Sequence, residues 1–121
     1  MRNMSKYEAG LRGQMEAEAF LKNNGYTILT RNYRVRTGEI DLIASIDNYI
    51  VFVEVKFRMG LNFGSPSESV GSAKQQKITN TALHYIAAKN LESQDFRFDV
   101  IEVFQKNGSI FVNHIENAFG A

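Results

Sequence analysis

The sequence predicts an α/β fold, in which one mixed β-sheet is flanked by helices in a single domain covering residues 1–121. Three observations support this prediction. A capped helical segment begins the chain, a β-hairpin pattern fills residues 38–57, and a second helical segment is followed by two further strands. No internal repeat, low-complexity segment or linker divides the chain.

The first helix is predicted from its ends. Ser5 and Glu8 have the Ser-x-x-Glu spacing of a capping box, so we expect a helix that runs to about Asn24 and stops at Gly25. Residues 26–33, rich in β-branched and aromatic side chains, predict the first strand.

The hairpin is predicted over Gly38 to Ile46 and Tyr49 to Phe57, with Asp47 and Asn48 as its turn. In a two-residue turn, Ile46 faces Tyr49, and the same register makes Asp41 face Glu54 and Glu39 face Lys56. A longer turn would shift this register. Residues 58–64 contain glycine and predict a loop.

The second helix has a predicted start at Ser65, with Pro66 in its first turn and Glu68 completing a capping box, and is expected to end near Lys89. Residues 97–104 and 110–115 then predict two strands joined by a turn over residues 106–109.

Composition limits the function classes. The chain is 44% hydrophobic and 22% charged, and it has no cysteine, which excludes disulfides and thiolate metal sites. No segment has the length of a membrane span or the core of a signal peptide, so we expect a cytoplasmic protein without a membrane partner. The net charge of +1 gives no support by itself for nucleic-acid binding.

The hairpin carries the candidate site. Side chains alternate along a strand, so Glu39, Asp41, Glu54 and Lys56 are expected to project from one face. Two opposed carboxylates repel each other unless a proton or a cation lies between them, and Mg²⁺ suits such an oxygen-rich site. Lys56 could then hold a phosphate or help to activate water. The alternative is a set of solvent-facing cross-strand ion pairs.

Further side chains could support this site. The basic residues that flank the hairpin would suit a phosphodiester substrate, although a scatter of surface charges is the alternative. They are Arg31, Arg34, Arg36, Arg58, Lys74 and Lys77. Lys74 lies in an apolar row of the second helix, where it either extends along the helix edge to solvent or points toward bound phosphate, and Gln75 beside it could act similarly. Gln14 and Glu18 border the apolar side of the first helix, and either could face the site.

Other titratable residues are predicted to be structural. Asp99 is expected to pair with Arg97 or another basic residue, and His114 to lie at the surface or to pack. With only two histidines and no ligand spacing, a zinc site is not expected.

The string Gly-Glu-Ile-Asp at residues 38–41, followed by Phe-Val-Glu-Val-Lys at 52–56, resembles the core of the PD-(D/E)XK nuclease superfamily. Nearly the whole chain resembles the YraN family of small bacterial proteins. The matching segments are residues 25–26, 31–34, 38–43, 52–56, 63–66, 74, 97–100 and 117–119. This resemblance implies a restriction-endonuclease-like core.

The resemblance also implies roles for individual residues. Asp41 and Glu54 match the acidic metal ligands, Val55 would add its backbone carbonyl, and Lys56 matches the lysine of the motif. One or two Mg²⁺ or Mn²⁺ ions would bind the scissile phosphate and activate water. Gln14 departs from the glutamate that the family typically has there, and Glu18 one turn later could compensate.

The function expected on these grounds is metal-dependent DNA endonuclease activity in repair or recombination, on branched or flapped DNA as in Holliday junction resolvase-like nucleases. Such relatives are often dimers, so a homodimer is a further expectation. Two alternatives stay open. One is a nucleic-acid-binding module that has lost catalysis or needs a partner, and the other is a structural or protein-interaction role.

Overall fold

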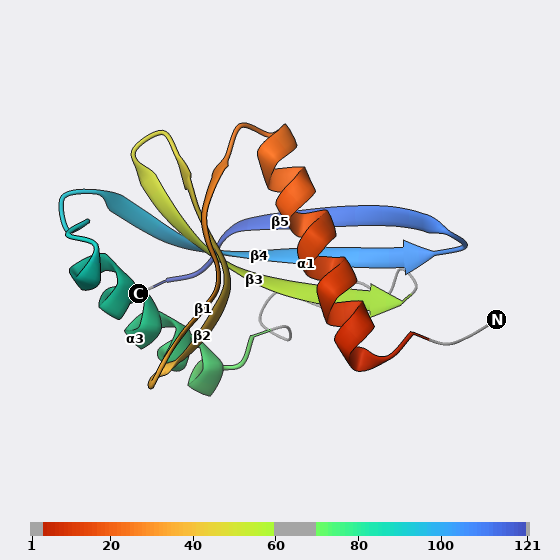
Figure 1. Ribbon diagram of the computed structural model, residues 1–121, viewed down its shortest axis with the longest axis horizontal. Helices are drawn as coiled ribbons and strands as arrows, with labels where there is room; N and C mark the ends of the chain where they lie inside the picture. Colours follow the sequence, from red (N-terminus) through yellow and green to blue (C-terminus); the bar gives the residue numbers. More distant parts are fainter. Residues whose placement is uncertain (1–3, 60–69, 121) are drawn as a thin grey trace.

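The structure is a computed structural model that describes residues 4–59 and 70–120 (Figure 1). Its elements follow the order helix, three strands, helix, two strands. They are α1 (Lys6–Asn23), β1 (Thr27–Val35), β2 (Gly38–Ile46), β3 (Tyr49–Met59), α3 (Ser72–Ala88), β4 (Asp95–Lys106) and β5 (Ser109–Phe119). No helix in the described ranges is both long enough and apolar enough to cross a membrane.

The strands form one mixed sheet in the order β1-β2-β3-β4-β5. Every neighbouring pair is antiparallel except β3 and β4, which are parallel. A parallel pair needs a crossover connection, and α3 lies in it. The α/β class and the mixed sheet predicted from the sequence are therefore confirmed.

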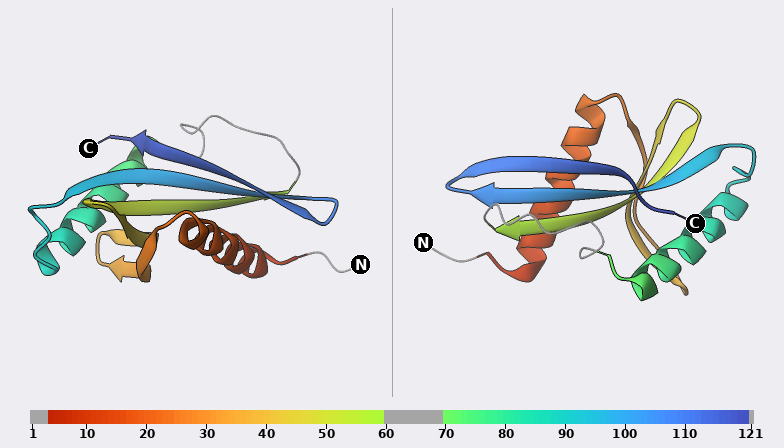
Figure 2. Two further views of the ribbon diagram at one scale, coloured as in Figure 1. Left: turned by 90° about the horizontal axis from the view of Figure 1, so that it is seen from above. Right: turned by 180° about the vertical axis from the view of Figure 1, so that it is seen from behind.

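The two helices cover different faces of this sheet. Figure 2 shows α1 along one face of the long strands β3 and β4. Ala17 and Leu21 of α1 pack there on Val51, Val53 and their neighbours. Gly13 allows this close approach, because an added Cβ would lie 3.0 Å from the Cβ of Phe57.

The other face is covered by α3 and contains an aromatic cluster. Ile78, Ala82 and Tyr85 of α3 belong to the same buried cluster as Phe52 and Phe98. The rings of Phe52 and Phe98 are stacked with centroids 5.6 Å apart. The central strands β3 and β4 are therefore buried on both faces, which explains their nearly continuous apolar sequence.

The ends of α1 agree with the prediction. Ser5 Oγ accepts a hydrogen bond from the Glu8 N–H at 3.1 Å, and the Glu8 carboxylate accepts one from the Ser5 N–H at 3.0 Å. Gly25 follows the helix with a φ of +88°, a conformation that glycine adopts without strain. The capping box and the glycine stop are both confirmed.

Two predicted boundaries are wrong. The second helix begins at Ser72 with Gly71 as its N-cap, not at Ser65, and the predicted cap at residues 65–68 lies outside the described residues. β3 continues through Arg58 and Met59, where a loop was expected. These two residues pair with β4, so hydrogen bonding to a strand distant in sequence overrides the local loop signal.

The predicted hairpin register holds near the turn and is lost farther away. Ile46 pairs with Tyr49 as expected, but the β2–β3 ladder ends at Leu42 and Val53. The expected pairing of Glu39 with Lys56 is therefore wrong: Glu39 pairs instead with Arg34 of β1. β2 leaves β3 at Asp41 and continues only with β1.

The same position interrupts the alternation of β2. Ile40 and Ile43 belong to the cluster under α3, whereas Leu42 belongs to the cluster under α1. Side chains three residues apart cannot share a face of a regular strand, so β2 is irregular around Asp41. Opposite Asp41, Asn32 of β1 has a φ of 51°. The β1–β2 ladder contains the Arg31–Leu42 pair and the pair beyond Asn32 and Asp41, but Asn32 and Asp41 themselves are not paired.

Candidate functional site

Asp41 lies where β2 and β3 separate. Its Oδ2 accepts a hydrogen bond from the backbone N–H of Val55 at 2.8 Å, just beyond the last ladder pair of Leu42 and Val53. The carboxylate therefore takes a position that a strand carbonyl would occupy in a continued ladder. This contact brings Asp41 to Glu54, even though the backbones of the two residues are not paired.

Asp41 and Glu54 interact through their side chains. Burial, followed by the hydrogen bond and repulsion from Glu54, raises the pKa of Asp41 well above its usual range. Burial acts in the same direction on Glu54, but hydrogen bonds from Asp41 and Lys74 outweigh it and lower the pKa of Glu54. The opposite directions of these shifts mean that the pair favours a single negative charge and that Asp41 retains a proton more readily than Glu54.

Two lysines lie beside this pair. Lys74 of α3 places its Nζ 2.5 Å from Glu54 Oε2, and the Glu54 side chain is only 7% exposed. That oxygen is buried and makes no hydrogen bond of regular geometry among the described residues. Burial and the nearby ammonium group of Lys74 lower the pKa of Lys56 against the opposing attraction of Glu54.

Two depressions meet at Asp41 and Glu39. One, of about 460 Å³, lies beside α1 and includes Gln14 and Val55. The other, of about 160 Å³, lies beside α3 and includes Glu54, Lys74 and Lys77. Asp41 is thus accessible from the sides of both helices, although Glu54 lies nearly buried between them.

The structure brings only some of the predicted site residues together. Asp41, Glu54, Lys56 and Lys74 form one interacting group. Glu39, Gln14 and Lys77 line the adjoining depressions, and Val55 contributes its N–H to Asp41. Gln75 lies next to Lys74, but its Nε2 donates a hydrogen bond to the carbonyl of Val70.

The remaining predicted residues have other contacts. Arg31 binds Glu18 through two hydrogen bonds of 2.6 and 2.8 Å, outside both depressions. These bonds, together with an ion pair to Lys22, hold the pKa of Glu18 at about 2. Arg58 binds the buried Glu102 at 2.9 Å. Each of these arginines therefore already has an acidic partner.

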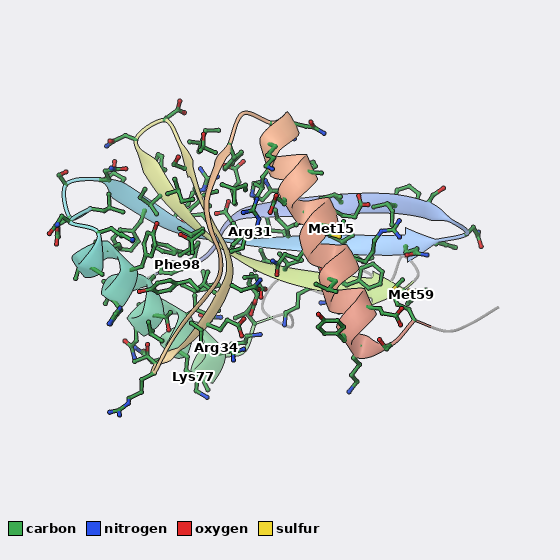
Figure 3. The ribbon with its side chains drawn as sticks, in the orientation of Figure 1. Met15, Arg31, Arg34, Met59, Lys77 and Phe98 are labelled. Carbon is green, nitrogen blue, oxygen red and sulfur yellow. The ribbon has the colours of Figure 1, made fainter. Side chains whose placement is uncertain are left out.

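Arg34 and Lys77 lie nearer the candidate site. Arg34 donates to Glu39 at 3.0 Å and is largely exposed, and Lys77 is also exposed. Figure 3 shows both where the free end of the β1–β2 hairpin meets the start of α3, with Arg31 beside α1. Arg36 is exposed in the turn between β1 and β2.

The donor set suits a hard divalent cation. Asp41 and Glu54 bring two interacting carboxylates to the point where the β2–β3 ladder ends, in a position that a cation could take. The Val55 N–H points toward β2, so its carbonyl also faces the space where the ladder has ended. Within residues 4–59 and 70–120, no group of three or more His, Cys, Asp or Glu side chains could hold a metal, so any ion here would depend on two carboxylates.

Sequence reasoning missed the residues that shape the larger depression. Asn32 was not singled out, although asparagine is enriched at positive φ and could have marked the irregularity in β1. Lys6, Tyr7 and Leu11 also line the depression. Tyr7 and Leu11 are both exposed, one aromatic and one apolar, and lie four residues apart on the same side of α1. This spacing is the sequence signal that could have indicated their shared surface.

A second polar cluster lies near the end of α1. Asp99 is fully buried and accepts hydrogen bonds from Arg97, from His114 and from the N–H of Asn117. Arg97 also donates to the Tyr26 hydroxyl at 2.5 Å. The expected pairing of Asp99 with Arg97 is confirmed, and His114 packs against the rings of Tyr26 and Phe20.

Comparison with known proteins identifies the family. Residues 13–103 match the model of the family described as Uncharacterised protein family UPF0102. A UPF0102 protein of Clostridium acetobutylicum is 50% identical to this chain over 93% of each sequence. One from Caldanaerobacter subterraneus is 47% identical over 98% of this chain and all of the relative. One from a Sulfurihydrogenibium strain is 48% identical over 96% of this chain and 97% of the relative. The chain therefore belongs to the UPF0102 family, the YraN-type family that its motifs resemble.

Proposed function

We propose that this protein is a metal-dependent DNA endonuclease of the PD-(D/E)XK type. One observation carries the proposal: the partly buried Asp41 and the buried Glu54 bring two carboxylates together next to two lysines, at the irregularity where β2 leaves β3. A purely structural ion pair would not need two acidic groups at one point. Two carboxylates at one point repel each other unless a proton or a cation lies between them, and a cation would relieve that repulsion.

Asp41, Glu54 and the Val55 carbonyl would hold Mg²⁺ or Mn²⁺. When bound, the ion supplies Lewis-acid stabilisation of the phosphate and lowers the pKa of water. Lys56, with its lowered pKa, is suited to orient the attacking water and to accept or share its proton. Lys74, half exposed beside Glu54, is suited to bind a non-bridging phosphate oxygen.

The surroundings support a nucleic-acid strand as substrate. Lys6 and Arg34 border the depression beside α1, and Lys74 and Lys77 border the depression beside α3. Cations on both sides of an acidic centre would hold phosphates that flank the scissile one. The fold fits this function, since the motif residues lie on a hairpin whose second strand is central and rigid.

A DNA-binding module that lacks turnover is the second candidate. Gln14 is favourable to it, because this neutral amide lies beside Asp41 where a third carboxylate would strengthen metal binding. Glu18 does not replace that carboxylate, since it is bound to Arg31. This candidate predicts salt-dependent DNA binding without metal-dependent cleavage.

Cleavage assays separate the two candidates. Labelled duplex, flap and four-way-junction DNA would be incubated with Mg²⁺ or Mn²⁺ and with wild type, Asp41→Asn or Glu54→Gln. Glu16→Gln is the matched control, since it removes a carboxylate of α1 that pairs with Arg12 outside both depressions. We expect cleavage by wild type and Glu16→Gln, and a loss on the order of 100-fold or more in both site variants.

Mn²⁺ binding by calorimetry provides a readout that does not depend on turnover. It should weaken in Asp41→Asn and Glu54→Gln and stay unchanged in Glu16→Gln. Unchanged cleavage in the site variants contradicts the nuclease proposal. Metal-independent DNA binding without cleavage by wild type would favour the binding module.

A further inference from the structure

The depression beside α1 is larger than a bound metal and a phosphate require. It has a volume of about 460 Å³, within the range of small-molecule sites, and leads from the surface of α1 to Asp41. It lies between the first turns of α1 and the irregular part of the β1–β2 hairpin. Its lining residues are Lys6, Tyr7, Gly10, Leu11, Gln14, Asn32, Arg34, Glu39, Asp41 and Val55.

The lining combines three kinds of group. Tyr7 offers an aromatic ring that is 75% exposed, and Leu11 adds an exposed apolar surface. Gln14 and Asn32 offer side-chain amides, each with donors and an acceptor. Lys6 and Arg34 are cations, and Arg34 balances the charge of Glu39. Few ligands combine an aromatic face, an edge with donors and acceptors, and a negative charge, and a nucleotide has all three.

The form of the nucleic acid follows from this lining. Bases of a duplex are stacked on one another and paired, so neither their faces nor their pairing edges could reach an aromatic ring and amides inside a depression. In a single strand both are available, and aromatic stacking is the usual way in which proteins bind unpaired bases. A site that bound only the phosphates on the surface of a duplex would need cations, but no aromatic ring and no amides.

We propose that this depression binds an unpaired nucleotide of the DNA strand, next to the phosphate that lies at Asp41. The base stacks on Tyr7 with its edge toward Gln14 and Asn32, and its phosphate is held by Lys6. The inference rests on the proposed function, to which it adds the substrate class: DNA with a single-stranded segment at the cleavage point. Gln14 then has a role that a carboxylate would perform less well, since the amide can both donate to and accept from a base.

Gly10 allows a direct test. A Cβ added there meets nothing within 4 Å, so a leucine can extend into the depression without a backbone clash. The change also replaces a helical glycine, which favours folding. Ala19→Leu is the matched control, because Ala19 is an exposed residue of α1 outside the depression. Tyr7→Ala and Tyr7→Phe test the ring and the hydroxyl separately.

Binding would be measured by fluorescence anisotropy with labelled oligo(dT) of about 12 nucleotides, a length typical of single-strand sites, and with a duplex of equal length. Ca²⁺ replaces Mg²⁺, so that binding is read without cleavage. We expect Gly10→Leu and Tyr7→Ala to weaken oligo(dT) binding roughly tenfold, with Ala19→Leu and Tyr7→Phe close to wild type. Duplex binding should change much less.

The outcomes separate this inference from the proposed function. Oligo(dT) binding that is absent in wild type, unchanged in Gly10→Leu, or lost together with duplex binding overturns the nucleotide subsite. Cleavage assays on the same proteins test the nuclease. If wild type cleaves DNA and Gly10→Leu binds and cleaves DNA as well as wild type does, the nuclease proposal stands and the nucleotide subsite is excluded. If changes at Gly10 and Tyr7 weaken single-strand binding but wild type does not cleave DNA, the nucleotide subsite stands and the nuclease proposal is excluded.

Discussion

Two acidic residues in the same sheet, the buried Asp99 and the partly buried Asp41, differ in the hydrogen bonds and ion pairs that their carboxylates receive. Asp99, fully buried, accepts hydrogen bonds from Arg97, His114 and a backbone N–H. Burial acts to raise its pKa, but the bonds from His114 and Arg97 lower it below its usual range. Asp41 instead faces Glu54, and its pKa is raised.

The difference distinguishes a structural group from a candidate site. The protein stabilises the ionised form of Asp99 with neighbours that complete its hydrogen bonds. At Asp41 it holds two carboxylates close together, and their mutual repulsion and burial raise the pKa of Asp41. A carboxylate with such a perturbed pKa marks a candidate for a functional site.

The largest expected contrast is in stability. Asp99→Asn removes the buried one of the two carboxylates that pair with Arg97, whose side chain is only 13% exposed, and should destabilise the protein by about 3 kcal/mol or more. Asp41→Asn replaces a carboxyl whose pKa is raised by folding with a neutral side chain of the same shape, so at pH 7 it should not destabilise the protein and should raise its stability. Urea denaturation at pH 7 measures both. Equal destabilisation would contradict the division into structural and site groups.

The two variants should also differ in their pH dependence. The folded pKa of Asp99 is lowered, so its contribution is present above the unfolded pKa of about 3.9 and is lost as the pH falls. The folded pKa of Asp41 is raised, so its contribution is greatest at low pH and is lost as the pH rises above about 4. Relative to wild type, Asp41→Asn should therefore gain stability with rising pH, and Asp99→Asn should lose it.

A smaller effect is expected at Lys74. Lys74→Met leaves the buried charge of Glu54 without its ammonium partner, but the lysine side chain is 48% exposed and solvent screens the pair. We expect a loss of about 1 kcal/mol, from thermal unfolding followed by circular dichroism. Lys77→Met is the matched control on the same helix face. If Mn²⁺ binds at Glu54, it should reduce the loss in Lys74→Met, and an equal loss with and without Mn²⁺ argues against that site.

The smallest effect is expected for the ion pair of Glu18 and Arg31 at the surface. Arg31→Ala should lower the melting temperature slightly and leave cleavage unchanged, since both side chains lie outside the depressions. The folded pKa of Glu18 is about 2, so the difference from wild type should be present above pH 4.5 and disappear as the pH falls toward 2. A strong loss of cleavage would instead place Arg31 in DNA binding.

Local signals predicted the parts of the fold that are local. The capping box at Ser5, the stop at Gly25 and the turn after Ile46 each depend on a few neighbouring residues, and all are confirmed. The grouping of Asp41 with Glu54 was also expected, although it arises differently. The predicted backbone pair is replaced by a side-chain bond from Asp41 to the N–H of Val55.

The predictions that were wrong concern features that depend on residues distant in the sequence. The length of β3 is decided by pairing of Arg58 and Met59 with β4, which local patterns do not contain. The start of α3 at Ser72, after Gly71, has no side-chain capping bond that could mark it in the sequence. A strict period of two also could not predict the irregularity at Asp41, because Asn32 on the neighbouring strand takes part in it. The acidic partners of Arg31 and Arg58 come from other elements for the same reason.

The hydrogen bonds of Asp99 also connect the two halves of the polypeptide. Through Arg97 and Asn117 they join Tyr26, at the start of the sheet, to its last strand. Every residue of the candidate site is synthesised earlier, between Lys6 and Lys77. A nascent or proteolysed chain that stops before Asn117 would carry the carboxylates and lysines of the candidate site, yet lack the bond from the Asn117 N–H that joins β5 to Asp99 of β4. We therefore expect such truncated chains to be less stable and to be cleared by proteases more readily.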